Sequence, residues 1–454
     1  MVSTVTILRR LPQEENRRKK ELKKIISLLL VAVMVVSLLC ACAGGSNDPS
    51  TPSSSGSEAL APSGETNEGK YAGVTINYWS MWNSSEPQGK VLQEAADEFQ
   101  KNTGATINIS WKGRELSNVI LASLEAKDDL DMFEGDYAFI SKTYKDYVLD
   151  LTEMAKAANY SEQSFACFND VATAWAGFLP CITEQPQVGG VFYNKDIFED
   201  CGITAPPATW TEFLEDCQKM VDKGYEPMAL DSAYCDFFMG YHLERHLGEA
   251  KVAELTVNGG WSNEPGAITA AQELIDFVKA GYLADGAPDE YPASQNKMGL
   301  TEKVAMVVCA NYVCAEINNN TGVELNWGMF NYPTVEGGVA TTNSYAGATG
   351  IAIAKHSSNA KAAFDFALFL TSGEMDQKMA NEASQIPADP RNTAPAIMDG
   401  TVETLLETTE PLSWGMGLYN NPDLTASILD WATKLFSGKF ESGEQAIQAL
   451  DALY

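Results

Sequence analysis

The sequence predicts an α/β fold of two lobes, because short strands and helices alternate along a chain too long for one hydrophobic core. From residue 70 onward, segments with the two-residue alternation of strands precede segments with apolar residues at helical spacing. This alternation is typical of βαβ units and a parallel sheet. About 385 residues lie in this region, and single cores stop growing at roughly 250–300 residues. We therefore expect two lobes.

A basic and then apolar leader occupies residues 1–41. Lysines precede the apolar run Ile25–Leu39, and Ala41 is the small residue that a signal peptidase requires before its cut. The run is about 15 residues long, which is short of the roughly 20 that span a bilayer. Leu39, Ala41 and Cys42 together resemble the lipobox of bacterial lipoproteins. We predict a signal peptide and a lipid anchor on Cys42, at the outer face of the cytoplasmic membrane.

Residues 42–70 are rich in Ser, Gly, Pro and Thr and contain almost no apolar side chains. A segment of this composition cannot bury a core, so we expect a flexible stalk.

The chain is strongly acidic, with a formal net charge of -30. The first 41 residues contain eight Lys and Arg against three Asp and Glu, so the remainder carries a net charge of about -35. Such a surface repels phosphate backbones, which argues against nucleic-acid binding.

The first elements after the stalk are expected in the order strand, helix, strand, helix, strand. The strands are residues 74–78, 106–111 and 130–133, and the helices are residues 90–101 and 118–127. Gly104 follows the first helix as a typical C-terminal stop.

Later elements follow the same logic. A strand begins at Val191, and Thr209 with Glu212 forms a capping box that opens a helix. Further strands are expected at 304–309 and 350–354, a helix at 359–370, and a mostly helical end.

Common catalytic and metal-binding patterns are absent. The sequence contains no GxSxG elbow, GxGxxG turn, P-loop or HExxH motif. The seven cysteines after Cys42 form no CxxC pair, and His242 and His246 lack an intervening Glu of the HExxH kind. We therefore predict no catalytic residues, no metal site and no cofactor, and expect most cysteines to be small buried side chains.

Aromatic and polar residues follow the expected strands. Trp79, Trp82 and Asn83 leave the first strand, and Glu134 and Asp136 follow the third. In open α/β sheets, ligands bind beyond the carboxyl ends of strands. Indole faces stack on the apolar faces of sugar rings while carboxylates and amides bind hydroxyls, so this set suits a neutral, hydroxyl-rich ligand. Either tryptophan can instead be part of the core.

The order of several blocks resembles family 1 extracellular solute-binding proteins, the sugar-capturing subunits of ABC importers. The blocks are Tyr78-Trp79, Asp131–Asp136, Tyr147–Thr152, Tyr193–Ile203 with Pro206–Phe213, Glu302–Met306, Gly350–Lys355 and Ile386–Ala388. Members often have Gly-x-Trp after the fifth block, where this chain has Asn311-Tyr312.

The resemblance implies a two-lobe, periplasmic-binding-protein-like fold with a hinge and an interlobe ligand cleft. Lobe one would comprise residues 71–183 and 311–385, and lobe two residues 184–310 and 386–454. It adds Trp261, Asn311, Tyr312, Tyr345 and Trp414 as ligand-binding candidates. The implied function is capture of a sugar or oligosaccharide by a monomeric, membrane-anchored protein, for delivery to importer permease subunits.

Two alternatives stay open. The ligand can be another small solute such as a polyamine, which would need several carboxylates converging with aromatic side chains. The chain can also be a secreted glycan-cleaving enzyme, which would need two carboxyl groups flanking the bound bond.

Overall fold

The computed structural model describes residues 69–454, and the leader and most of the stalk, including Cys42, lie outside the described residues. Its eight strands form one mixed sheet in the order β2-β1-β3-β8-β4-β6-β5, with β7 pairing on β4. The strands are β1 (Thr75–Ser80), β2 (Thr106–Trp111), β3 (Met132–Asp136), β4 (Ile182–Asn194), β5 (Glu226–Ala229), β6 (Val304–Ala310), β7 (Trp327–Phe330) and β8 (Ala346–Ile353).

Strand β1 lies parallel to both β2 and β3, which confirms the βαβ units expected from the sequence. Strand β8 is antiparallel to β3 and to β4, so the sheet is mixed where only parallel pairing was predicted. The reason is that β8 arrives from the second half of the chain and not through a βαβ crossover.

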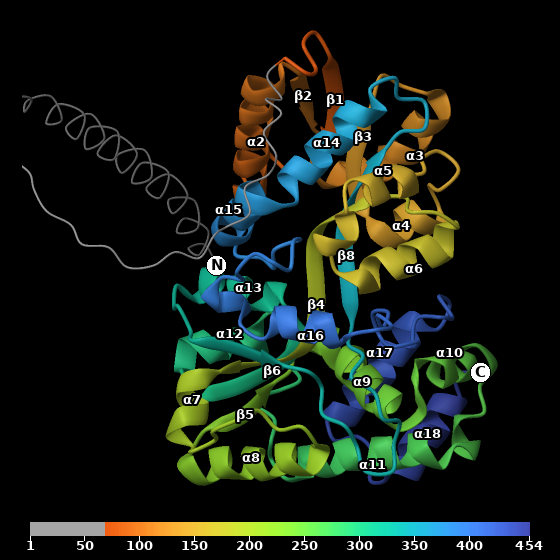
Figure 1. Ribbon diagram of the computed structural model, residues 1–454. Coiled ribbons are helices and arrows are strands. Elements are labelled where there is room, and N and C mark those ends of the chain that lie inside the picture. Colours follow the sequence, from red (N-terminus) through yellow and green to blue (C-terminus); the bar gives the residue numbers. More distant parts are fainter. Residues whose placement is uncertain (1–68) are drawn as a thin grey trace, which may run out of the picture. The chain divides into compact units, whose positions relative to one another are not determined.

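Strand β4 belongs to both lobes. Its residues 182–188 pair with β8, and its residues 189–194 pair with β6 and β7. Figure 1 shows β4 and β8 running together from the group that contains β1–β3 toward the group that contains β5 and β6. We call these groups the first and the second lobe.

The first lobe has helices on both faces of its strands. They are α2 (Pro87–Thr103), α3 (Leu116–Ala126), α4 (Tyr137–Lys142), α5 (Thr152–Ala157), α6 (Ala166–Ala176), α14 (Ala360–Leu370) and α15 (Gly373–Ala383), with short 3-10 turns η1 (Gly113–Glu115) and η2 (Tyr160–Glu162).

Helix α2 illustrates how the local sequence sets an element. Its apolar residues Val91, Ala95 and Phe99 recur at helical spacing and are buried. The ring of Phe99 packs edge-on against Phe366 of α14. Gly104 ends the helix with a φ of 80°, a conformation that glycine adopts without strain.

The second lobe contains the remaining helices. They are α7 (Lys195–Asp200), α8 (Trp210–Lys223), α9 (Cys235–Leu247), α10 (Glu249–Asn258), α11 (Pro265–Lys279), α12 (Ala293–Thr301), α13 (Tyr312–Thr321), α16 (Thr401–Glu407), α17 (Thr425–Phe436) and α18 (Gly443–Asp451), with the turns η3 (Ser232–Tyr234), η4 (Trp261–Asn263) and η5 (Ala396–Met398).

In the second lobe, helix α8 begins at a capping box and helix α9 is deeply buried. The capping box of Thr209 and Glu212 is formed at the start of α8, as predicted. Helix α9 is buried from Cys235 to Arg245 and packs against α10, α11 and α17, so it is the central helix of this lobe.

The lobe boundary expected at residue 311 differs from the structure. Helix α13 packs on α12, and β7 pairs with residues 191–194 of β4, so residues 312–330 lie with the second lobe. The chain re-enters the first lobe through β8 instead. The physical reason is that α13 starts directly after β6 and folds back onto the same lobe.

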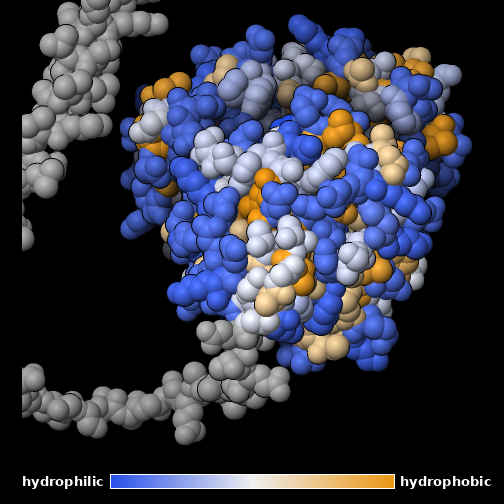
Figure 2. Space-filling view, turned by 90° about the horizontal axis from the view of Figure 1, so that it is seen from above, coloured by the Kyte–Doolittle hydropathy of each residue, from blue (hydrophilic) through white to orange (hydrophobic). Residues whose placement is uncertain are grey.

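The surface seen in Figure 2 is largely hydrophilic, with apolar side chains scattered over it. None of the helices between residues 69 and 454 has the length and apolar character that crossing a bilayer requires. Six of the seven cysteines in this part of the chain are buried, which confirms that most are small core side chains. The seventh, Cys201, is half-buried.

Candidate ligand-binding site

A cavity of about 800 Å³ opens between the two lobes. Its first-lobe wall is formed by α4 and α6, and its second-lobe wall by α9, α10 and two loop segments, residues 339–346 and 410–414. The volume falls within the roughly 300–1,000 Å³ that small-molecule sites occupy. Three of the predicted site residues line it, namely Asp136, Tyr345 and Trp414.

Tyr345 and Trp414 form one aromatic group. Their rings meet edge-on with centroids 5.2 Å apart, and Trp414 stacks on Phe237 of α9 at 4.2 Å. Phe237 therefore covers one indole face, and half-buried Trp414 has only the opposite face to offer a ligand. The Tyr345 hydroxyl donates to Oε1 of Gln187 on β4 at 3.2 Å, which fixes the ring beside this strand.

Trp175 is a cavity residue that sequence reasoning missed. It lies in the last turn of α6, and the Lys142 ammonium sits 3.6 Å from the centroid of its ring. The contact is a cation–π interaction, so a ligand must share or displace Lys142 to stack on this face. Its sequence context, an apolar helix, gave no signal that distinguished Trp175 from a core tryptophan.

Asp136 caps α4 and faces the cavity. Its Oδ1 accepts a hydrogen bond from the backbone N–H of Phe139 at 3.0 Å. The side chain is reached by solvent but lies in a concave site, and this partial desolvation raises the pKa of Asp136 above its ordinary value, against the lowering effect of two backbone N–H groups.

The charges around the cavity are unbalanced. Four carboxylates line it, contributed by Asp136, Glu244, Glu249 and Glu410, whereas Lys142 is the only cation among its described lining residues. Glu249 is held by the backbone N–H and the hydroxyl of Ser413, at 2.8 and 2.5 Å.

Glu244 is buried and paired with neighbouring Arg245 on α9. Three carboxylates therefore remain without an ion-pair partner among the described residues.

A second group of predicted residues lies at the carboxyl end of β1, outside this cavity. The Lys112 ammonium lies 3.9 Å from the centroid of the half-buried Trp79 ring, and the Arg114 guanidinium lies 4.4 Å from the centroid of the buried Trp82 ring. Asn83 is exposed and donates its backbone N–H to Glu86.

Glu134 of the same group is buried on β3. Its carboxylate accepts from the Tyr78 hydroxyl at 2.7 Å, from Ser80 Oγ, and from the Met81 backbone N–H at 2.7 Å. Burial nevertheless raises the pKa of Glu134 to about 7. Glu184, equally buried on β4, lies close enough to act on it electrostatically. Glu134 is thus part of the interior and does not reach the cavity.

The last three predicted residues are also outside the cavity. Trp261 is fully buried in the second lobe, and its Nε1 donates to the Tyr454 hydroxyl, so we omit it from the proposed site. Asn311 is buried beside β4 and accepts from the Val188 N–H at 3.1 Å. Tyr312 is 37% exposed at the start of α13.

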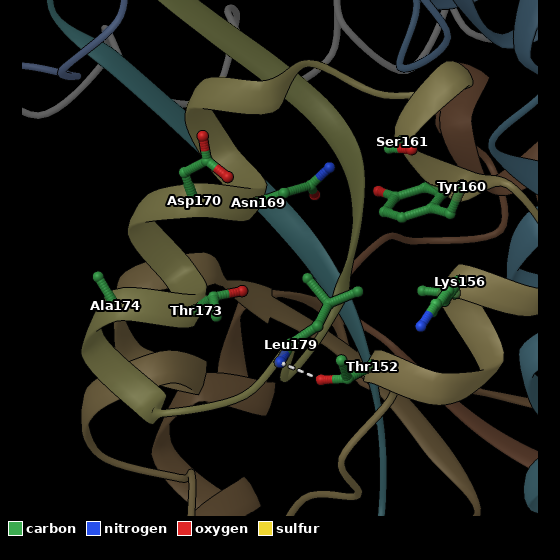
Figure 3. Close-up of a pocket in the computed structure, with 10 residues that line it drawn as sticks. Thr152, Lys156, Tyr160, Ser161, Asn169, Asp170, Thr173, Ala174 and Leu179 are labelled. Carbon is green, nitrogen blue, oxygen red and sulfur yellow. Dashed lines mark hydrogen bonds between the residues drawn. The ribbon is translucent and has the colours of Figure 1, made fainter.

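A further hollow, of about 520 Å³, lies in the first lobe alone (Figure 3). It is lined by α5, η2 and α6, with Lys156, Tyr160 and Asp170 around it. The Leu179 N–H donates to Thr152 Oγ1 at 3.1 Å along its floor. Because one lobe supplies every lining residue, relative motion of the lobes would not enclose a ligand there.

Comparison with known proteins agrees with this architecture. A binding protein of Brucella abortus is 22% identical over 201 residues, which is 44% of this chain, and the chain spans about half (48%) of that relative's length. The multiple sugar-binding protein of Streptococcus mutans is 25% identical over 320 residues, covering 67% of this chain and 73% of the relative.

A solved structure shows the same fold at low identity. The bacterial solute receptor AcbH, described as preferring β-D-galactopyranose, aligns over 85% of this chain and 98% of its own, with a TM-score of 0.68 and 15% identity. The family model for bacterial extracellular solute-binding proteins matches residues 83–377, which is more than half of the chain. The chain belongs to the bacterial extracellular solute-binding protein family.

Proposed function

We propose that this protein captures a sugar or oligosaccharide outside the cytoplasmic membrane and delivers it to the permease of an ABC importer. The observation that carries the proposal is the interlobe cavity with Trp175, Tyr345 and Trp414 in its wall. Aromatic faces bind the apolar faces of sugar rings, and the carboxylates nearby accept hydrogen bonds from ring hydroxyls. The sugar-binding relative from Streptococcus mutans supports the same ligand class.

The proposed mechanism is capture without chemistry. Because β4 runs through both lobes and β8 leads the chain back into the first, bending of these strands can bring α4 and α6 toward α9 and α10 around the ligand. The closed form would then be the shape that the permease recognises. No catalytic residue takes part in this mechanism, and the carboxylates that line the cavity act as hydrogen-bond acceptors for the ligand.

Calorimetric screening against a glycan panel tests the ligand class. We expect saturable binding of at least one oligosaccharide, unchanged glycan after incubation, and a smaller radius of gyration by X-ray scattering when it is bound. A glycan that is cleaved would contradict capture without chemistry, and tight binding with no compaction would contradict closure.

The proposed location rests on the leader. We propose that Cys42 carries the lipid anchor, since acyl chains contribute roughly 0.8 kcal/mol per buried CH₂ and several of them hold a protein firmly on a membrane. Cys42→Ala should release the protein from the membrane fraction or leave it unprocessed. Normal cleavage with retention on the membrane would exclude Cys42 as the anchor.

A polyamine is the second candidate ligand, and the excess of carboxylates around the cavity favours it. Asp136, Glu249 and Glu410 face the cavity together with its aromatic residues, opposed only by Lys142 among the described lining residues. Salt separates the two ligands, because screening weakens binding of a cation and hardly affects a neutral sugar. Spermidine binding that falls steeply with salt, without any response to glycans, would favour the polyamine.

A further inference from the structure

Three side chains that can bind a metal converge in the second lobe, away from the proposed ligand cavity. His242 and His246 lie four residues apart on α9, and Glu273 lies on α11. The Nε2 atoms of both imidazoles lie 2.8 Å from the same Glu273 oxygen, Oε2. All three donor atoms lie within 4.8 Å of one another.

We propose that His242, His246 and Glu273 form a zinc site that links α9 to α11. Two imidazole nitrogens and one carboxylate oxygen are a ligand set that zinc accepts, with water at the fourth tetrahedral position. Zinc bonds of about 2.0–2.1 Å place tetrahedral ligand atoms roughly 3.3 Å apart. Each imidazole would therefore move about half an ångström from the carboxylate, a shift that the half-buried Glu273 side chain can absorb.

The surroundings of His242 prepare it as a ligand. Its other ring nitrogen, Nδ1, lies 3.0 Å from the hydroxyl of buried Tyr332, and the ring packs on Trp210 with centroids 4.5 Å apart. Partners of this kind fix the orientation of a ligating imidazole. With Nδ1 engaged by Tyr332, Nε2 is the ring nitrogen that faces Glu273 and is available to a metal.

The carboxylate is prepared in the same sense. Its Oε2 atom lies between the Nε2 atoms of His242 and His246, at hydrogen-bond distance from both. The Glu273 side chain is 32% exposed, whereas the His242 and His246 side chains are 0% and 5% exposed. A metal ion can therefore enter past Glu273, and water has access to the fourth position.

The competing interpretation is a hydrogen-bonded triad without metal. In that state both Nε2 atoms carry a proton and donate to Glu273, and Nδ1 of His242 accepts from Tyr332. With zinc bound, Nε2 is bare and Nδ1–H donates to the same hydroxyl, which can serve either tautomer. The two states therefore differ in the tautomer of His242, which the nitrogen-15 chemical shifts of the ring distinguish, and the move of the proton from Nε2 to Nδ1 releases none to the buffer.

The site would also affect the cavity wall. The same helix carries Tyr241, whose hydroxyl accepts the Tyr345 backbone N–H at 3.0 Å, and Glu244, which lines the cavity. A metal between α9 and α11 would hold this helix in place. The proposal itself does not depend on the identity of the ligand in the cavity.

The experiment is titration of the chelator-treated protein with zinc chloride and, separately, with cobalt chloride. We expect one tight site per chain and the visible absorption of four-coordinate cobalt with nitrogen and oxygen ligands. His246→Gln and Glu273→Gln should each weaken zinc binding at least tenfold, and Tyr332→Phe, which removes an orienting partner, by roughly tenfold. His356→Gln is the matched control, because His356 lies outside this cluster.

The proposal is overturned if wild-type protein gives no saturable zinc binding, or if His246→Gln and Glu273→Gln bind zinc as tightly as the control. Should either variant fail to fold, the cobalt spectrum of the wild type decides alone. Octahedral, weakly absorbing cobalt would indicate adventitious surface carboxylates and would refute the site.

Discussion

Two groups of aromatic residues in this protein differ in what covers their rings. At the carboxyl end of β1, Lys112 lies over Trp79 and Arg114 over Trp82, and Trp82 is 7% exposed. In the interlobe cavity, Trp414 packs on Phe237 with one face, while half-buried Tyr345 meets it only edge-on. A position at the end of a strand thus makes an aromatic residue a candidate for ligand binding, but the neighbouring chain segments decide whether one face of its ring is left for a ligand.

The carboxylates of β3 show the same contrast within one strand. Glu134 is buried and accepts hydrogen bonds from Tyr78, Ser80 and Met81, whereas Asp136, two residues later, faces the cavity. The two residues point to the same side of the sheet, yet only the one at the very end of the strand is open to solvent.

The largest expected effect is on stability at the end of β1. Trp82→Ala should lower the free energy of unfolding by about 3–5 kcal/mol, the range for deleting a buried tryptophan side chain. Denaturant unfolding without ligand measures it. A ligand-free stability close to that of the wild type, with strongly weakened sugar binding, would instead place Trp82 in the binding site.

The next effect concerns the cavity. Trp414→Ala should weaken glycan binding by about 1–3 kcal/mol, as expected for truncating a buried contact residue, with a smaller loss of ligand-free stability. Isothermal titration measures the affinity. Trp111→Ala is a suitable control, because half-buried Trp111 lies on edge strand β2, and equal losses in both variants would exclude a specific role for Trp414.

The buried carboxylates predict a dependence on pH. The pKa of Glu184 is raised by burial first and by Glu134 second, and neither Glu184 oxygen has a hydrogen-bond partner within 3.5 Å. Above the ordinary glutamate pKa of 4.5, the folded protein therefore binds more protons than the unfolded chain. As a result, Glu134 and Glu184 make the free energy of unfolding fall as the pH rises toward about 7.

Removing one member of the pair should reverse this loss. Glu184→Gln should raise the unfolding free energy at pH 7, because it removes the carboxylate whose pKa burial raises, and should change it little at pH 4. Unfolding curves across pH 4–8 measure the difference. A variant that is less stable than the wild type at pH 7 would show that the charge is compensated.

The smallest expected effect distinguishes a sugar from a polyamine as the ligand. Lys142→Met removes the cation from the Trp175 ring, a contact worth roughly 0.5–1 kcal/mol at an exposed site. Affinity for a neutral sugar should change by no more than this amount, while affinity for a polyamine should rise because a like charge is removed. Titrations with both ligands at two salt concentrations distinguish these outcomes.

Local spacing in the sequence determined much of the fold. The strands and helices between residues 74 and 133 and the capping box of α8 follow from patterns a few residues long, because each depends on which side chains share a face or cap a helix end. The order of short blocks was also sufficient to identify the family, which the comparison confirms. The leader and Cys42 remain predictions from sequence alone.

Tertiary structure decided what depends on distant segments meeting. Pairing of β8 with β3 and β4 placed Tyr345 beside Gln187, and packing of α6 on α4 placed Lys142 over Trp175. The third member of the His242 and His246 cluster, Glu273, comes from another helix. Spacing along the chain cannot reveal such contacts, because they arise from the burial of whole helix and sheet faces and not from local periodicity.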